Sequence, residues 1–563
     1  MSTSTPLTHS SISRRTFMEL SGAAWIGSML GAGQLPRPAP SPTRPQDTPR
    51  PNFLIIVTDQ ERAPCHWPAG WAEANLPHRT RLAANGLTFR RAYCNSTMCS
   101  PSRATFFTGM YSAHHGVTHT LTYGGSQSPS ETPLLPGTQT WGQMLADAGY
   151  QVVLKGKWHI SKGANGGVPT AADVASFGFQ QWEPTTAGEG QNINDYGGGC
   201  ADWDTQITQQ AVSFLQSQTA ETTANQPFAL VVGLVNPHDV IGYPNDWDST
   251  TEPGCSNYAT IDLDQGIGLP PSNSADTLDN KPTCHAESRN LYAVGLGTLL
   301  SQQDRLNYVN FYAALHKLVD VHIGTLLDAL DESVRDQTIV ILTADHGEAG
   351  LSHNGLRQKM FNAYEEVIRI PLVISNPVRF STPQTTDAYA ALVDLMPTLA
   401  SLASVPSPER WKMQGVDLSP ILANPATSVQ DAILFVYDDE DAGLADGMLT
   451  VNGQPIVRQP NHIRALRLRD LDGEWLYARY FDPDAVEAEQ LEMYHLTDGN
   501  GQEIDIDEID NLAAPSSPHY EEPFYVAKRA ALAQRLAALE EEHLTPHTQF
   551  LPWIGTSTDG LQG

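Results

Sequence analysis

The sequence lacks an excess of basic residues. Its 563 residues include 33 lysines and arginines but 63 aspartates and glutamates, which gives a formal net charge of −30. This balance argues against a protein that binds nucleic acid, because such binding needs basic surface facing the phosphates. An acidic field would also repel a sulfated or phosphorylated substrate, so such a substrate would need a local basic pocket. No internal repeat is evident, and the length allows one large core with a smaller module.

The sequence also lacks a hydrophobic run long enough to span a membrane. Its best candidate, residues 20–33, is shorter than the roughly twenty apolar residues of a membrane helix. Residues 13–18, just before it, resemble a twin-arginine export signal. We therefore expect residues 1–35 to be a signal peptide and residues 36–51 a proline-rich linker. The twin-arginine machinery would export the folded protein to the periplasm or the cell exterior, with a retained anchor as the alternative.

Cysteine is scarce, with six residues in the whole chain. An oxidising compartment outside the cytoplasm would permit a disulfide. We predict a pair between Cys255 and Cys284, because they flank one polar loop. The remaining cysteines are Cys65, Cys94, Cys99 and Cys200.

Four short apolar runs without alternating polarity indicate strands buried on both faces of a parallel sheet. Each is followed by polar side chains, and ligands in open α/β sheets bind beyond the carboxyl ends of the strands. We therefore predict one shared site, although an aspartate there can cap a turn and a lysine or histidine can be a surface group. The runs are residues 52–58, 151–154, 228–235 and 338–343, followed by Asp59 and Gln60, by Lys157 and His159, by His238, and by Asp345 and His346.

The rest of the chain is predicted to cover and extend this sheet. Residues 304–330 show the longest helical pattern, and the polar residues 239–297 should form a loop over the site that helps to select the substrate. Further helices are expected at 138–148, 202–218, 389–402 and 526–542, and a small antiparallel sheet at 433–437, 463–468, 475–481 and 492–496. The predicted divisions are a catalytic domain at 52–430, a C-terminal subdomain at 431–545 and a tail at 546–563.

Residues 99–109 carry the clearest chemical motif, Cys-Ser-Pro-Ser-Arg-Ala-Thr-Phe-Phe-Thr-Gly. Pro101 suits the first turn of a helix, which places Cys99 at the helix N-terminus and Arg103 one turn further on. Unpaired backbone N–H groups, the helix dipole and the arginine would stabilise negative charge there. The ordinary alternative is a helix start with a buried structural cysteine.

This motif resembles the signature of the type I sulfatases, C-x-P-S-R-x-x-x-[LF]-T-G, at every specified position. Segments around Lys157, His238, Asp345 and Lys359 resemble further motifs of that family. The resemblance implies an α/β fold like that of alkaline phosphatase, with a large mixed, mostly parallel sheet sandwiched by helices and a small C-terminal antiparallel sheet with one helix. It also implies that a separate formylglycine-generating enzyme oxidises Cys99 to formylglycine, whose hydrated aldehyde is the nucleophile in sulfate-ester hydrolysis.

The resemblance gives the other site residues separate roles. Arg103 and Lys157 would hold the oxygens of the sulfate group, and His238 and Lys359 would stabilise or protonate the leaving oxygen. His159 would take a proton from the second hydroxyl of the hydrate, so that the aldehyde re-forms and sulfate leaves. The substrate would be a small or oligosaccharide sulfate ester.

The resemblance also implies one divalent metal, with Asp59, Gln60, Asp345 and His346 as ligands. Calcium is the expected ion. Gln60 and His346 depart from the family's usual residues, and a nitrogen ligand makes manganese the alternative. The same two residues resemble the choline-sulfatase and phosphonate-monoester-hydrolase branch, so a phosphonate monoester, a phosphodiester or choline sulfate stays open as the substrate. A non-catalytic sulfate-ester binding protein is a further alternative, in which Cys99 stays unmodified.

Overall fold

The computed structural model describes residues 50–124, 128–252, 254–440, 450–451 and 454–545. The predicted signal peptide, the linker as far as residue 49 and the predicted tail lie outside these ranges and stay predictions. Within the described ranges, no helix combines the length and the apolar character that crossing a membrane requires.

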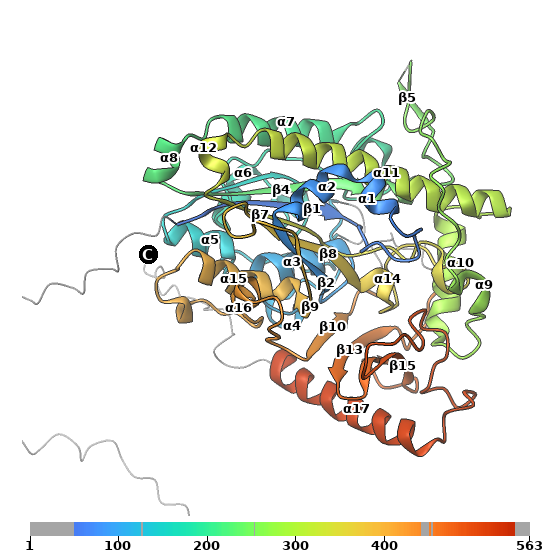
Figure 1. Cartoon of the computed structure of the whole chain (residues 1–563). Coiled ribbons are helices and arrows are strands. Elements are labelled where there is room, and N and C mark those ends of the chain that lie inside the picture. The colour runs from blue at the N-terminus through green and yellow to red at the C-terminus, as the bar shows by residue number, and fades with distance from the viewer. Residues whose placement is uncertain (1–49, 125–127, 253, 441–449, 452–453, 546–563) are drawn as a thin grey trace, which may run out of the picture. The chain divides into compact units, whose positions relative to one another are not determined.

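A seven-stranded sheet with the order β3-β4-β1-β7-β8-β2-β9 lies at the centre (Figure 1). Its four neighbouring parallel strands are the four predicted apolar runs: β1 (Asn52–Asp59), β3 (Gln151–Gly156), β4 (Phe228–Pro237) and β7 (Thr338–Ala344). Strand β8 (Arg369–Ser375) is antiparallel to both of its neighbours, and β2 (Gly86–Tyr93) and β9 (Gln384–Ala391) are parallel to each other. The sheet is therefore mixed and mostly parallel, as predicted.

Hydrophobic cores cover both faces of this sheet. In β1, Phe53, Ile55 and Val57 enter one core, whereas Leu54 and Ile56 enter the other, because successive strand side chains point to opposite faces. Helices supply the outer layers in Figure 1. On the first face lie α3 (Cys99–Thr108), α5 (Trp141–Asp147) and α15 (Leu395–Leu402), and on the second α2 (Pro77–Ala84), α7 (Trp203–Gln216) and α11 (Gln302–Asp328).

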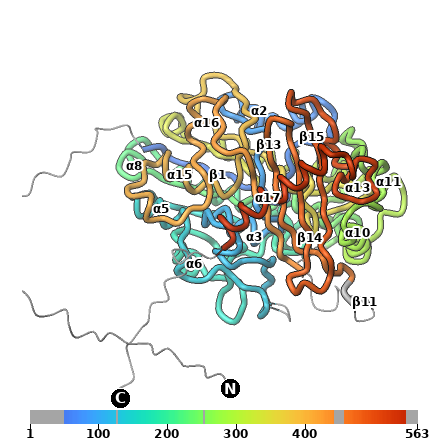
Figure 2. Tube along the Cα trace, turned by 90° about the horizontal axis from the view of Figure 1, so that it is seen from below, coloured from blue at the N-terminus to red at the C-terminus, as the bar shows by residue number. Residues whose placement is uncertain are grey.

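A second, four-stranded antiparallel sheet has the order β10-β13-β14-β15. Helix α17 (Pro523–Leu544) packs on it and runs across it in the view of Figure 2. This sheet is joined to the segment that leads into α3, because Val436 N donates to Asn95 O at 2.8 Å and Asn95 Nδ2 donates to Leu434 O at 3.1 Å. Its strands are β10 (Ala432–Tyr437), β13 (His462–Asp470), β14 (Gly473–Phe481) and β15 (Gln490–Asp498).

The shorter elements connect these layers. The helices are α1 (Trp71–Asn75), α4 (Ser112–His115), α6 (Ala171–Ser176), α8 (Ala220–Asn225), α9 (Ser272–Ala275), α10 (Thr283–Gly295), α12 (Glu332–Arg335), α13 (Ser352–Gly355), α14 (Glu365–Ile368) and α16 (Ser419–Ala423). The strands are β5 (Thr250–Glu252), β6 (Cys255–Ser256), β11 (Thr450–Val451) and β12 (Gln454–Pro455).

Two predictions about local structure were wrong. The region 239–297 is not a plain loop, since it contains β5, β6, α9 and the thirteen-residue helix α10. The helix predicted at 389–402 begins only at Leu395, because Tyr389 to Ala391 pair with Arg91 to Tyr93 in the sheet. Pairing between distant segments outweighs the local helical pattern there.

The predicted disulfide was also wrong. Cys255 is bonded to Cys200, which precedes α7, and not to Cys284. Cys284 lies in α10 with its side chain fully buried, and its thiol faces Phe361 O at 3.7 Å. Packing of α10 into the core therefore holds Cys284 away from Cys255.

Candidate active site

Cys99 is the first residue of α3, as the motif predicted. Met98 before it has φ 67°, a left-handed conformation that an L-residue adopts only when its surroundings hold it there. At the other end of α3, Gly109 has φ 64°, and a Cβ there would lie 2.8 Å from Met396 Cβ. The motif's last glycine is therefore required by the close contact between α3 and α15.

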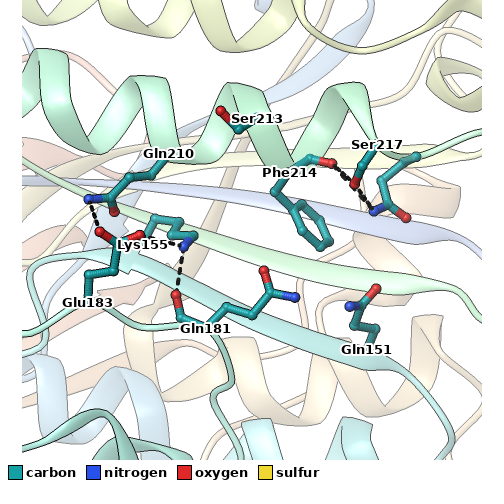
Figure 3. Close-up of a pocket in the computed structure, with 9 residues that line it drawn as sticks. Gln151, Lys155, Gln181, Glu183, Gln210, Ser213, Phe214 and Ser217 are labelled. Carbon is teal, nitrogen blue, oxygen red and sulfur yellow. Dashed lines mark hydrogen bonds and ion pairs between the residues drawn. The ribbon is translucent and has the colours of Figure 1, made fainter.

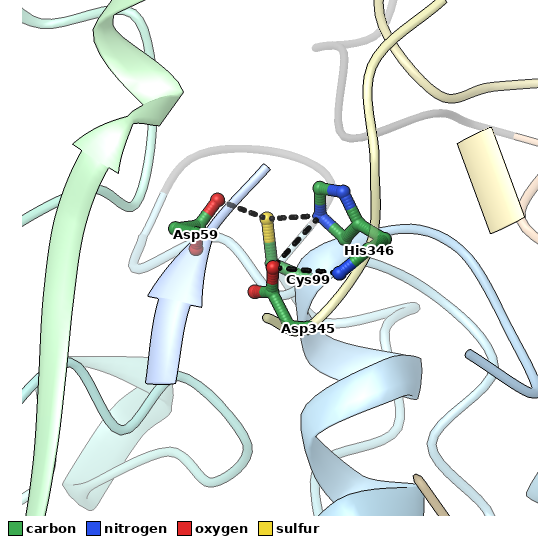
Figure 4. Close-up of side chains that lie close together, drawn as sticks. All are labelled: Asp59, Cys99, Asp345 and His346. Atoms are coloured by element: carbon green, nitrogen blue, oxygen red, sulfur yellow. Dashed lines mark hydrogen bonds and ion pairs between the residues drawn. The ribbon is translucent and has the colours of Figure 1, made fainter. Parts of the chain in front are cut away.

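The Cys99 thiol lies in a buried cluster with Asp59, Asp345 and His346 (Figure 4). Its sulfur is 3.6 Å from Asp59 Oδ1 and 3.4 Å from His346 Nε2. One ligand atom from each of the four residues lies within 4.8 Å of the others. The carboxyl ends of β1 and β7 and the N-terminus of α3 thus converge on one point, as the strand-end argument predicted.

Backbone amides hold Asp345 and His346 in place. Asp345 Oδ1 accepts from Gln60 N at 3.0 Å and from His346 N at 2.9 Å. His346 Nδ1 lies 3.0 Å from Gly347 O, and a carbonyl only accepts, so Nδ1 carries the hydrogen. In the neutral imidazole, which is the form that binds a metal, the lone pair of Nε2 then points into the cluster.

Two cations lie against the cluster's carboxylates. The guanidinium of Arg103 donates to Asp345 Oδ2 at 2.9 Å and to Asp59 Oδ2 at 3.1 Å, and Lys157 Nζ lies 2.6 Å from Asp59 Oδ2. Lys157 also donates to Gly188 O. All of these side chains are buried. The acidic chain therefore contains the local basic pocket that an anionic substrate requires.

Charge in the cluster changes its acid–base properties. Burial and Asp59 raise the pKa of the Cys99 thiol, but Lys157, Lys359 and His346 outweigh them, so that it lies well below its usual value. Burial and Asp59 raise the pKa of Asp345 to about 6, although His346 and Arg103 act in the opposite direction. Two buried carboxylates and one imidazole nitrogen are ligand types that a divalent cation accepts.

The two predicted proton-transfer histidines lie beside this cluster. His159 has φ 57° and its Nε2 donates to Leu121 O at 2.8 Å, which leaves Nδ1, a buried atom without a geometric partner, for Cys99. Burial lowers the pKa of His159 below its usual value, and the nearby Cys99 opposes this shift in part. His238 follows β4, is 3% exposed and has an unpartnered Nδ1. Burial raises the pKa of Asp59, but Lys157, His238 and Arg103 outweigh burial and hold the pKa well below its usual value, so His238 lies near the same carboxylate.

Gln60 and Lys359 bind each other. Lys359 Nζ donates to Gln60 Oε1 at 2.5 Å, while Gln60 Nε2 donates to Glu348 Oε2 at 2.5 Å and to Gln358 Oε1 at 3.0 Å. Glu348 Oε1 in turn accepts from Tyr308 OH at 2.8 Å. Gln60 is thus fixed by its own hydrogen bonds, and its predicted role as a metal ligand stays a prediction.

Comparison with known proteins agrees with this geometry. The family model described as Sulfatase matches residues 51–405. The chain belongs to the sulfatase family. It is therefore an enzyme that hydrolyses sulfate esters. An uncharacterised sulfatase of Escherichia coli, YidJ, is 30% identical over 64% of this chain and 69% of its own length, and an N-acetylglucosamine-6-O-sulfatase of Bacteroides thetaiotaomicron is 26% identical over 69% and 73%.

Solved structures show the same fold at low identity. BT1596, a 2-O GAG sulfatase, superposes with a TM-score of 0.62 and 20% identity, over 88% of this chain and 92% of that one. The phosphonate monoester hydrolase SpPMH from Silicibacter pomeroyi superposes with a TM-score of 0.60 and 20% identity, over 88% and 96%. The predicted fold class is confirmed.

Sequence reasoning missed two residues of this sulfatase's site, Glu348 and Gln358. Glu348 follows the Asp345-His346-Gly347 segment directly, and that adjacency was the available signal. Its side chain faces Gln60, a residue 288 positions earlier, and no local pattern predicts this pairing.

A separate hollow in the sulfatase, with a volume of about 350 Å³, lies between β3 and α7 (Figure 3). Its polar side chains bind one another: Lys155 Nζ donates to Gln181 O at 2.6 Å, and Gln210 Nε2 donates to Glu183 Oε2 at 2.9 Å. Neither of the two groups of buried potential metal ligands in the described ranges lines it.

Proposed function

We propose that this sulfatase acts through a formylglycine made from Cys99, with a divalent cation bound by Asp59, Asp345 and His346. The observation that carries the proposal is the position of the Cys99 thiol, 3.4 Å from His346 Nε2 and 3.6 Å from Asp59 Oδ1 at the N-terminus of a helix. Sulfatases generally use a metal and a formylglycine. The cation, when bound, supplies positive charge that lowers the pKa of the nucleophile.

The chain's own side chains supply binding and proton transfer. Arg103 and Lys157 bind oxygens of the sulfate group and keep the group in line with position 99. His238 or Lys359 gives a proton to the leaving alcohol oxygen as the sulfur–oxygen bond breaks. One hydroxyl of the hydrated aldehyde forms the new bond to sulfur as the ester bond breaks. His159 then accepts the proton of the second hydroxyl through Nδ1, so that the carbon–oxygen bond to the sulfate group breaks, the aldehyde re-forms and sulfate leaves.

Calcium is the proposed ion and manganese the alternative. Asp59 and Asp345 supply the oxygens that calcium prefers. The free Nε2 of His346 adds a nitrogen, which manganese accepts more readily than calcium does.

We propose a sulfated saccharide as the substrate. The relative named N-acetylglucosamine-6-O-sulfatase supports a sugar sulfate. The fold shared with SpPMH keeps a phosphonate monoester as the second candidate, since a tetrahedral anion of the same size fits the same cations. Choline sulfate is the third.

Export by the twin-arginine route stays part of the proposal. The Cys200–Cys255 disulfide supports it, because such bonds persist in oxidising compartments. The twin-arginine machinery exports folded proteins, so a formylglycine and a metal acquired in the cytoplasm would leave the cell together with the chain.

Rates measured side by side on an aryl sulfate, a glucosamine 6-sulfate, an aryl phosphonate monoester and choline sulfate test the substrate. We expect kcat/KM to be highest for a sulfate ester, and highest among those for the sugar. A phosphonate preference of about tenfold or more would overturn the sulfate assignment.

Peptide mass spectrometry of active protein tests the nucleophile. The peptide that carries position 99 should be lighter by roughly eighteen daltons than its sequence requires, as conversion of a thiol to an aldehyde demands. The peptide that carries Cys284, another buried free cysteine, is the control and should keep its sequence mass. Full activity with an unmodified Cys99 would refute the proposal.

A further inference from the structure

A second group of metal-binding residue types lies outside the active site. His353, Glu366 and Glu508 place one ligand atom each within 4.8 Å of the others, and all three side chains are buried. Across the described ranges, only this group and the active-site cluster bring three or more such ligand atoms so close together. We refer to these three residues as the His353 cluster.

The histidine in the His353 cluster is oriented as a metal ligand. Its Nδ1 lies 3.0 Å from Asp276 Oδ2, and an ionised carboxylate only accepts, so Nδ1 carries a hydrogen. Nε2 then faces Glu366 Oε2 at 3.5 Å. Both of these atoms are buried, and apart from this contact with each other neither has a hydrogen-bond partner. A carboxylate on the far nitrogen is a common support for a metal-bound histidine, and His346 is held in the same way by Gly347 O.

Neighbouring cations do not fully neutralise the carboxylates. Glu508 Oε1 lies 3.4 Å from Arg467, but Arg467 also pairs with Glu365. Glu366 Oε1 has His66 Nε2 at 2.7 Å, while its Oε2 faces only His353 Nε2, beyond normal hydrogen-bond distance. The cluster therefore has room in its charge balance for a further cation.

We propose that His353, Glu366 and Glu508 bind a divalent transition-metal ion, best matched by Zn²⁺, at a structural site distinct from the active-site metal. Zinc accepts one imidazole nitrogen with carboxylate oxygens, whereas calcium prefers oxygen throughout. The three ligands come from α13, from α14 and from the segment between β15 and α17. The ion would tie the loop that carries Lys359 to the C-terminal part of the chain.

A proton on His353 is the competing occupant. Burial lowers the pKa of His353, but Glu366 and Asp276 outweigh it and raise the value to about 9. Without a metal, an imidazolium would lie between Asp276 and Glu366, and Glu508, whose pKa burial raises to about 8, would be largely protonated. Glu508→Gln separates the two cases, because it removes a metal ligand but imitates a protonated Glu508.

The test compares three proteins produced in zinc-supplemented medium: the wild type, Glu508→Gln and, as the matched control, Asp345→Asn in the active site. Zinc content is measured in two ways: native mass spectrometry of the intact protein, and elemental mass spectrometry of the acid-digested protein. We expect wild type and Asp345→Asn each to bind one zinc ion per chain at the His353 cluster, and Glu508→Gln to lack this ion. A chelator should lower Tm of the first two by about 3–5 °C, zinc should restore it, and Glu508→Gln should respond to neither.

Two results would overturn the site: Glu508→Gln with the same zinc content as wild type, or a wild-type Tm that neither chelator nor zinc changes. Glu366→Gln carries the same expectation and replaces Glu508→Gln if that variant does not fold. The site does not depend on the proposed catalytic function, since zinc content and Tm are read without any substrate.

Discussion

The active-site cluster and the His353 cluster contain the same kinds of ligand in different surroundings. Each has a buried histidine whose Nδ1 is held by an oxygen and whose Nε2 faces carboxylates. Only the first contains a nucleophile precursor, Cys99, with Lys157 and Arg103 beside it. The second is closed by Tyr364, which stacks on His353 with ring centroids 3.6 Å apart. The neighbours of a ligand set, more than the set itself, separate a reactive site from a structural one.

The largest effect should come from Cys99→Ala. It removes the nucleophile, so kcat should fall by roughly 10³-fold or more, while Tm changes little. Glu508→Gln should do the reverse, with lower Tm and nearly normal kcat. Steady-state rates and thermal melts of both variants, read together, check this crossed pattern.

Cys94→Ala is the matched control for Cys99→Ala. Cys94 is buried five residues earlier, and its sulfur faces only Val367 O, at 3.9 Å. It should keep wild-type kcat and lose about 1 kcal/mol of stability. If Cys94→Ala inactivated the enzyme as strongly as Cys99→Ala, the loss would reflect packing and not chemistry.

An intermediate effect should come from Glu348→Gln. The carboxylate of Glu348 accepts four hydrogen bonds, from Gln60, Tyr308, Gly350 and Gln358. In Glu348→Gln an NH2 group replaces one of the two acceptor oxygens, so at least one of these donors would lose its acceptor. Gln60 would lose its fixed orientation at the edge of the active-site cluster. We expect kcat to fall about 10–100-fold, at unchanged KM.

Tyr308→Phe removes one of the four donors to Glu348 and leaves the others. It should lower kcat by only about two- to fivefold. Equal rates for wild type and Glu348→Gln would show that Gln60 needs no support from Glu348, and would confine the active site to the groups around Cys99.

The four central strands could be predicted because each is buried on both faces and reads as a continuous apolar run. Two outer strands could not. In β2, Arg90 and Arg91 interrupt the pattern, and in β9 Thr385 and Asp387 do so, because near the sheet's edge these side chains reach solvent or ion pairs. The apolar pattern of a strand reflects how its side chains are buried. Near the edge of the sheet the side chains are only partly buried, so the pattern is incomplete and does not predict the strand.

The residues of the candidate site likewise divide into those that the sequence predicts and those that it does not. Residues that directly follow a strand, such as Asp59 and Asp345, were predictable because the end of the strand fixes their position. Glu348, Glu508 and the Cys200–Cys255 bond join segments distant in sequence. Such contacts depend on the whole packing, and a single sequence holds no local signal for them.

The smallest effect concerns His462, a histidine between two carboxylates to which no third ligand comes close within the described ranges. Its Nδ1 lies 3.1 Å from Asp438 and its Nε2 3.9 Å from Glu440. Burial lowers its pKa, but these carboxylates outweigh burial and raise it to about 9. A folded-state pKa above the unfolded value of about 6.5 stabilises the protein fully below pH 6.5, and this stability is lost as pH rises through 9. Partial hydration limits the contribution to about 1 kcal/mol.

Tm of wild type should therefore fall between pH 6.5 and 9 relative to His462→Gln, whatever the zinc concentration. A parallel fall in both proteins would show that His462 gains no proton from folding, and a zinc-dependent difference would make its site resemble the His353 cluster.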